Sequence, residues 1–138
     1  MALRIEITNA SGGRYRGRQD IIDAVARACK GQKVRNAWID IIILDDKSIR
    51  RMNRDFLDHD YATDVITFPL EDIPLTGEIY ISLDTARKQA DDYGVTLVNE
   101  LSRLAVHGAL HLMGHDDATD EDRAGMHKLE NRYINGRT

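Results

Sequence analysis

The sequence predicts an α+β fold in which a mixed four-stranded sheet packs with about five helices. Strand-like apolar stretches and longer segments with helical periodicity follow one another without strict alternation, in the order β-α-β-α-β-β-α-α-α. The chain has 138 residues, of which 42% are hydrophobic and 30% charged. This length and composition suit one soluble domain with one core, so we expect a single domain over residues 1–138.

The first half of the chain supplies two strands and two helices. Residues 3–8 (LRIEIT) alternate apolar and polar side chains, which predicts a half-buried strand. A helix is expected over 20–31, with Asp20 as its N-cap. Residues 37–44 (AWIDIIIL) are apolar almost throughout, as is typical of a central strand. The helix expected over 45–57 has one apolar and one basic face. Its basic face holds Lys47, Arg50, Arg51 and Arg54.

The second half supplies two strands and three helices. Strands are expected over 63–70 and 77–83, separated by a short loop. A helix over 84–94 ends at a glycine, and a more apolar helix over 96–113 follows it. The last helix, over 119–136, begins with TDED, which fits the capping-box pattern.

Composition excludes several classes of protein. The net charge of −4 argues against non-specific nucleic-acid binding over the whole surface, although a local basic patch remains possible. The longest apolar stretch, over 39–44, is too short to span a membrane, and the N-terminus lacks the apolar region of a signal peptide. We therefore expect a cytoplasmic protein. The one cysteine, Cys29, is expected to be buried, so a zinc site would need His, Asp or Glu ligands.

The segment HGALHLMGHDD, residues 107–117, carries the candidate metal ligands. His107 and His111 lie one helical turn apart on the same face of the 96–113 helix, so both imidazoles can reach one ion. If the helix continued, His115 would lie about 12 Å from His107 along its axis, too far to bind the same ion. We expect a turn at Gly114, where glycine can adopt the left-handed conformation.

After such a turn Asp117 can fold back to the metal, which gives it a modest lead over His115 as the third ligand. Three protein ligands leave a position open, as in catalytic zinc sites. The glutamate of the HExxH metalloprotease motif is missing, because residue 108 is glycine. A protease is therefore a weaker interpretation.

With these residues in view, the chain resembles the YbeY endoribonuclease family over about residues 38–133. HGALHLMGHDD is similar to the family pattern H-G-x-L-H-L-x-G-Y-D-H. TDVITFP at 63–69 resembles the family's T-D-V-L-S-F-P block, and GEIYIS at 77–82 resembles its G-D-I-x-I-S strand.

The resemblance implies a metal-dependent endoribonuclease that acts on single-stranded RNA. It implies roles in ribosomal RNA maturation, including the 3′ end of the 16S RNA, and in ribosome quality control, with the ribosome as a partner. The family usually holds zinc at positions one, five and eleven of the motif, which are His107, His111 and Asp117 here. The third departs from the family, with Asp in place of His, and widens the choice of metal towards Mn²⁺ or Fe²⁺. His115 stands where the family usually has Tyr.

The candidate catalytic residues are Arg54 and Glu78. Many family members carry an arginine where this chain has Leu57, and Arg54, one turn earlier, could replace it. Glu78 and Asp64 fall in the matched blocks and could orient the ligand histidines by accepting from their N–H groups. Three aromatic residues are candidates for stacking single-stranded bases: Tyr61, Phe68 and Tyr80.

Two other functions remain open at this point. One is a metallohydrolase that acts on a peptide or small molecule, for which the generic His-x3-His pair is the only support. The other is a non-catalytic ribosome-binding module with a structural metal, which a fourth protein ligand such as His115 would favour. His59 and His127 match no ligand position and are expected on the surface.

Overall fold

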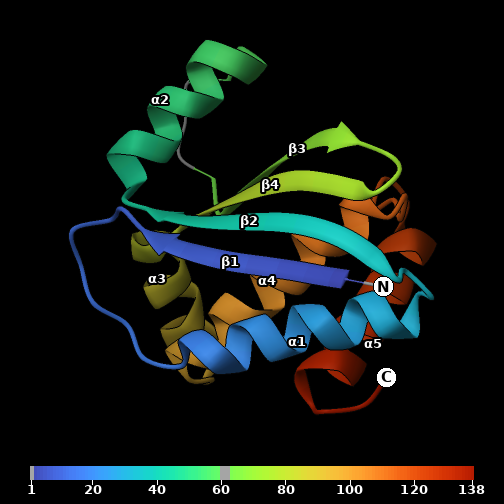
Figure 1. Cartoon of the computed structure of the whole chain (residues 1–138). Coiled ribbons are helices and arrows are strands. Elements are labelled where there is room, and N and C mark those ends of the chain that lie inside the picture. Colours follow the sequence, from blue (N-terminus) through green and yellow to red (C-terminus); the bar gives the residue numbers. More distant parts are fainter. Residues whose placement is uncertain (1, 60–62) are drawn as a thin grey trace.

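The elements follow one another in the predicted order (Figure 1). The computed structural model describes residues 2–59 and 63–138. The strands are β1 (Ala2–Asn9), β2 (Asn36–Leu44), β3 (Val65–Glu71) and β4 (Leu75–Ser82). The helices are α1 (Arg18–Gly31), α2 (Asp46–Leu57), α3 (Leu83–Tyr93), α4 (Leu97–Leu112) and α5 (Asp120–Ile134).

The four strands form one mixed sheet in the order β1-β2-β4-β3. β1 pairs in parallel with β2, and β2 with β4, whereas β3 runs antiparallel to β4. The short connection between β3 and β4 allows that antiparallel pair, because parallel neighbours need a longer crossover. The predicted α+β class and the central position of β2 are both confirmed.

Helices cover one face of this sheet. Figure 1 shows α1, α3, α4 and α5 beneath the strands and α2 standing on the other side. Alternate residues of β2 point down into the core and are fully or almost fully buried: Ala37, Ile39, Ile41 and Ile43. We call this the covered face and the opposite one the open face.

α4 lies directly against β4. A Cβ atom added to Gly108 would lie 2.7 Å from Cγ2 of Ile79, and one added to Gly77 would lie 2.5 Å from a methyl group of Leu112. Glycine at both positions therefore allows the helix and the strand to approach closely. This contact places the histidine-bearing helix at the centre of the covered face.

The helix ends test the capping predictions. The Thr119 side chain accepts from the backbone N–H of Asp122 at 3.0 Å, which confirms the cap expected there. The N-cap expected at Asp20 is wrong. α1 begins earlier, after Gly17 in a left-handed conformation (φ 94°), and Asp20 lies in its first turn. A glycine can turn the chain into a helix without a side-chain cap, which a search for capping side chains does not detect.

Two expectations from composition can also be compared with the structure. Cys29 is fully buried, as predicted, and burial raises the pKa of its thiol to about 11. The prediction of a small buried hydrophobe is therefore confirmed. None of the helices in the described part of the chain is both long and apolar enough to cross a membrane.

Candidate metal centre

The two histidines of α4 are held side by side by the helix itself. The Thr96 side chain accepts from the backbone N–H of Asn99 at 3.1 Å and so fixes the start of the helix. One turn separates His107 from His111, and both side chains are half-buried. Their Nε2 atoms lie 3.0 Å apart. The prediction that the pair points to one place is confirmed.

The chain turns sharply where the helix ends. Gly114 has a φ of 97°, in the left-handed region, and its N–H bonds the carbonyl oxygen of His111 at 3.0 Å. The N–H of His115 reaches back to the carbonyl oxygen of Leu110, also at 3.0 Å. These bonds are typical of a glycine-terminated helix. The turn expected at Gly114 is confirmed.

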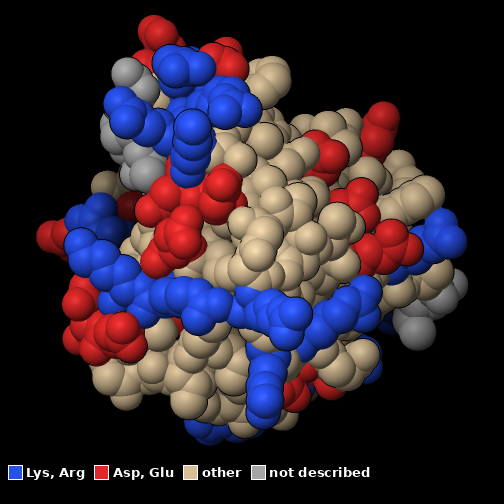
Figure 2. All heavy atoms as spheres, turned by 90° about the vertical axis from the view of Figure 1, so that its left-hand side faces the viewer, with Lys and Arg blue, Asp and Glu red and all other residues tan. Residues whose placement is uncertain are grey.

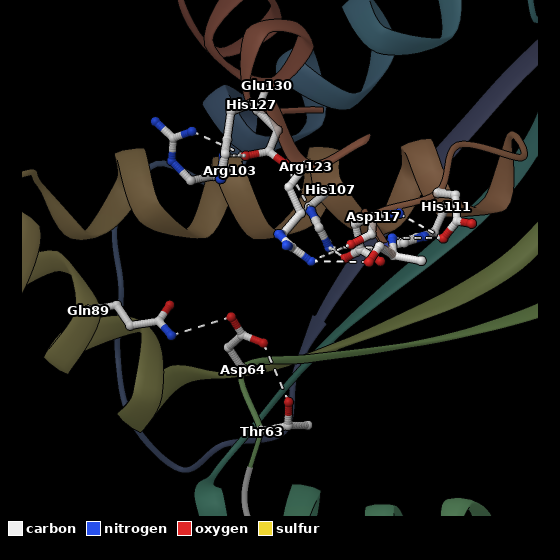
Figure 3. A network of polar contacts seen from close by, with 12 residues as sticks. Thr63, Asp64, Gln89, Arg103, His107, His111, Asp117, Arg123, His127 and Glu130 are labelled. Carbon is white, nitrogen blue, oxygen red and sulfur yellow. Dashed lines mark hydrogen bonds and ion pairs between the residues drawn. The ribbon is translucent and has the colours of Figure 1, made fainter. Parts of the chain in front are cut away.

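This turn brings Asp117 back to the histidines (Figure 3). The Asp116 side chain accepts from the N–H of Asp117 at 2.8 Å, and Nη1 of Arg123 donates to the carbonyl oxygen of Asp117 at 3.2 Å. Oδ2 of Asp117 lies 3.4 Å from Nε2 of His107 and 3.3 Å from Nε2 of His111. These three atoms, each a potential metal ligand, form a triangle, which we call the ligand triangle.

The ligand triangle has the size that a tetrahedral metal site requires. Bonds of about 2.0–2.1 Å at tetrahedral angles place neighbouring ligand atoms about 3.3 Å apart. The three edges measured here are 3.0, 3.4 and 3.3 Å. The group His107, His111 and Asp117 could therefore hold one ion. Nitrogen and carboxylate oxygen are both zinc ligands, so the chemistry of the donors also fits.

His115 lies outside the triangle. Its Nε2 is 2.6 Å from Oε1 of Gln32, at the end of α1, and Nε2 of Gln32 donates to the hydroxyl of Tyr133 at 2.8 Å. Among residues 2–59 and 63–138, the group that could hold a metal consists of three residues and does not include His115. The geometry therefore favours Asp117, as the spacing did.

Glu130 of α5 orients His107. Its Oε2 lies 2.8 Å from Nδ1 of His107, which leaves Nε2 free to face the triangle. Burial by itself lowers the pKa of His107, but the hydrogen bond and charge of Glu130, together with the Asp117 charge, raise the pKa above its ordinary value. Burial raises the pKa of Glu130, but His107, His127 and Arg103 hold it below its ordinary value.

Sequence reasoning missed Glu130. A signal was present, because Met126, Glu130 and Tyr133 share one stripe of α5 and all three are buried. A carboxylate on the core-facing stripe of a helix needs a partner there, since charged groups are almost never buried alone. That stripe could have pointed to a histidine on the neighbouring helix.

The position of Glu78 argues against the orienting role expected for it. Gly77 and Ile79 face α4, and successive side chains of a strand point to opposite faces, so Glu78 lies on the open face. Its neighbour there is Tyr80, whose pKa burial raises and the Glu78 carboxylate raises further. Asp64 does lie on the side of the histidines, but it accepts from Nε2 of Gln89 at 3.3 Å.

Arg54 projects from α2. It is exposed, and its Nε bonds the neighbouring Asp55 carboxylate at 3.2 Å. Leu57, in the position of the family's arginine, is 43% exposed. No contact between either residue and the ligand triangle is present among the described residues.

The predicted stacking residues fall on the open face. The ring centroids of Phe68 and Tyr80 are 5.7 Å apart in an edge-to-face arrangement, and Phe56 of α2 lies 6.0 Å from Phe68. These rings are packed on one another, away from α4. Tyr61 lies outside the described residues. His59 and His127 are exposed, as expected.

Comparison with known proteins agrees with the motifs. The family model described as endoribonuclease YbeY matches residues 8–137. The endoribonuclease YbeY of Chlorobaculum tepidum is 50% identical over 97 residues, which cover 70% of this chain and 71% of that protein. The endoribonuclease YbeY of Solibacter usitatus is 43% identical over 116 residues, which cover 84% of this chain and 77% of that protein.

A solved structure shares the architecture. The solution structure of a protein from Thermotoga maritima superposes with a TM-score of 0.64 at 26% sequence identity. The match covers 95% of this chain and 85% of that one. The sheet and helices described above are therefore shared across most of the chain.

Proposed function

The chain belongs to the endoribonuclease YbeY family, and from this premise we propose that it is a metal-dependent endoribonuclease of single-stranded RNA. We place it in the cytoplasm, as one domain over residues 1–138. Its substrate would be ribosomal RNA, with maturation of the 16S 3′ end and ribosome quality control as its roles and the ribosome as its partner. The family and the motif resemblance support this assignment.

The observation that carries the proposal is the ligand triangle with a side left open. His107, His111 and Asp117 would hold the ion, and the donors and distances suit zinc. The Asp117 carboxylate also suits Mn²⁺ or Fe²⁺. When bound, such an ion polarises a phosphoryl oxygen or activates water. In the described part of the chain a fourth ligand is lacking, which favours a catalytic over a purely structural site.

The protein's own residues would keep this centre in place. Glu130 accepts from Nδ1 of His107 and so fixes which ring nitrogen faces the triangle. Gln32 contacts His115 and so tethers the loop that carries Asp117 to the end of α1. Both supports come from other helices, so the geometry does not depend on the loop alone.

Binding of the RNA backbone would fall to the cationic side chains of α2. Figure 2 shows basic side chains gathered on α2 at the top of the molecule and in a band below it, with acidic side chains between them. The exposed cations of α2 are Lys47, Arg50, Arg51 and Arg54. Phosphate contacts of this kind position the nucleic acid without reading its sequence. Arg54 is our candidate for the phosphate nearest the cleavage point.

The central experiment compares the wild type with His111→Ala. Bound metal is measured on the purified proteins, and both are tested on single-stranded and duplex RNA. We expect metal affinity and single-strand cleavage to fall more than about a hundredfold in the variant. Losing a residue that only hydrogen-bonds a metal ligand costs up to about a hundredfold. His59→Ala, an exposed histidine outside the triangle, is the control. Unchanged metal content and cleavage in His111→Ala would refute the site.

A second pair of variants tests the third ligand. Asp117→Ala should lose metal to the same extent as His111→Ala, because it removes one vertex of the triangle. His115→Ala should keep the larger part of its metal, since His115 contacts Gln32 instead. The reverse result would make His115 the ligand, and full metal in both variants would exclude both residues.

A further inference from the structure

A cavity of about 500 Å³ lies beside the ligand triangle and is not part of it. His107 and Tyr93, the last residue of α3, both line it. Figure 3 shows Asp64 and Gln89 on one side of this space and Arg103 and His107 on the other. The volume is within the range of small-ligand sites. We call it the lateral pocket.

One wall of the lateral pocket holds a buried acceptor without a hydrogen bond. Glu100 is 1% exposed, and its Oε1 accepts no hydrogen bond within the described structure. Nε of Arg103 lies 3.8 Å away, too far for a hydrogen bond. The two terminal nitrogens of Arg103 donate elsewhere, to Glu130 at 3.2 Å and Asn131 at 2.9 Å. Buried polar atoms are nearly always paired, so this oxygen points to a missing donor.

The charges of the pocket limit what that donor can be. Three carboxyl groups line it, those of Asp64, Glu100 and Glu130, against the guanidinium of Arg103 and the imidazoles of His107 and His127. Such a lining disfavours a phosphate group. These carboxylates also do not form a metal-binding group among the described residues, where the ligand triangle alone qualifies. A neutral group that donates hydrogen bonds fits best.

We propose that the lateral pocket is a nucleobase subsite that prefers guanine. Guanine presents adjacent donors, N1–H and N2–H₂, on its Watson–Crick edge, and a carboxylate can accept both. The side chain of Tyr93, 64% exposed at the pocket, offers a ring on which an unstacked base can lie. Because His107 borders both the pocket and the triangle, a base bound here places its own backbone beside the metal centre.

This inference rests on the proposed function, since it assumes that RNA is the substrate. It adds that cleavage occurs next to a preferred base. Asp64 and Gln89 contribute further polar groups on the wall opposite Arg103, which would limit the orientation of the base. The basic face of α2 would then bind backbone, and the lateral pocket would read one base.

The test measures binding without cleavage. The zinc-loaded protein is titrated at about pH 8, above the pKa of about 7 of Glu100, with guanosine, inosine, adenosine, cytidine and uridine, and the amide signals of Gln89, Glu100 and Arg103 are followed by NMR. Guanosine should bind on the order of tenfold tighter than adenosine, cytidine and uridine. Inosine, which keeps N1–H and lacks the N2 amino group, should fall between them. Equal binding of all five nucleosides, or no shift at these amides, overturns the proposal.

Two variants and a control locate the effect. Glu100→Gln should lose most of the roughly tenfold preference for guanosine, because an amide supplies one acceptor and no charge. Tyr93→Ala should weaken all nucleosides alike, by about fivefold or more. Trp38→Ala removes an aromatic side chain that is 45% exposed on the open face and should bind as the wild type does. Guanosine preference that survives Glu100→Gln refutes the assignment of this carboxyl.

The outcome is separable from that of the proposed function. Guanosine binding in a protein that cleaves no RNA would refute the activity and leave the subsite standing. Cleavage that is indifferent to the neighbouring base, with no guanosine binding, would refute the subsite alone. If Glu100→Gln fails to fold, the comparison of guanosine with inosine on the wild type still decides the question.

Discussion

Glu130 and Glu78 have the same side chain but lie in opposite surroundings. Glu130, on the side of the covered face, is 1% exposed and contacts His107, Arg103 and His127. Glu78 lies on the open face of β4, partly exposed. The first carboxylate is held by three cationic or titratable neighbours from two helices, whereas the second has Tyr80 as its neighbour on the strand.

The difference separates polar side chains that buried partners hold in place from side chains that are exposed to solvent. On the covered face, buried partners fix the direction of each polar side chain, as a metal centre requires. On the open face and α2, aromatic and cationic side chains reach solvent, as with Phe56, which is 70% exposed. Such residues can contact a large ligand but do not coordinate a small ion. Three substitutions test this contrast, and they are ordered by the expected change in the free energy of unfolding or of zinc binding.

The largest expected effect is on Glu100, the buried carboxyl of the covered side. Burial raises its pKa from 4.5 to about 7, and the charges of Asp64 and Glu130 add to the rise against that of Arg103. The folded state then binds this proton more tightly than the unfolded state. The free energy of unfolding therefore falls as pH rises from 4.5 to about 7.

Glu100→Gln removes that titration. Relative to the wild type, the variant should gain about 3 kcal/mol of stability between about pH 4 and about pH 8. Urea unfolding followed by circular dichroism at several pH values measures the difference. A difference that does not change with pH would show that Glu100 titrates alike in the folded and unfolded chain.

An intermediate effect is expected where α4 meets the sheet. Gly108→Ala forces a methyl group within 2.7 Å of Ile79 and should lower the free energy of unfolding by about 2 kcal/mol. The matched control is Gly125→Ala in α5, where nothing lies within 4 Å of the added methyl group. That change should stabilise the helix by about 1 kcal/mol. Equal changes in thermal stability for Gly108→Ala and Gly125→Ala would contradict the close approach of α4 to β4.

The smallest expected effect compares the two glutamates directly. Glu130→Gln should weaken zinc binding by about tenfold, or about 1.4 kcal/mol, because the amide retains an acceptor for His107 but loses the charge. Glu78→Gln, the same change on the open face, should leave zinc affinity unchanged. Competition with a chelator gives both affinities. If Glu78→Gln lost as much zinc affinity as Glu130→Gln, Glu78 would have the orienting role that its place on the open face argues against.

The elements and the histidine pair were predictable because their causes are local. Apolar periodicity located the strands and helices, and the i,i+4 spacing of His107 and His111 placed both on one helical face. Gly114 indicated the turn that returns Asp117 to them. The start of α1 was less predictable, since Gly17 supplies backbone freedom and no capping side chain.

The sequence by itself determined the histidine pair of the ligand triangle, because helix geometry sets the spacing of His107 and His111, and it favoured Asp117 over His115 as the third member. Tertiary structure alone decided which carboxylate orients His107. Strand alternation only requires that Glu78 points to the face opposite Gly77 and Ile79. The packing of α4 against Gly77 and Ile79 makes theirs the covered face and so leaves Glu78 on the open face. Glu130 reaches His107 from 23 residues away, and such contacts depend on how helices pack.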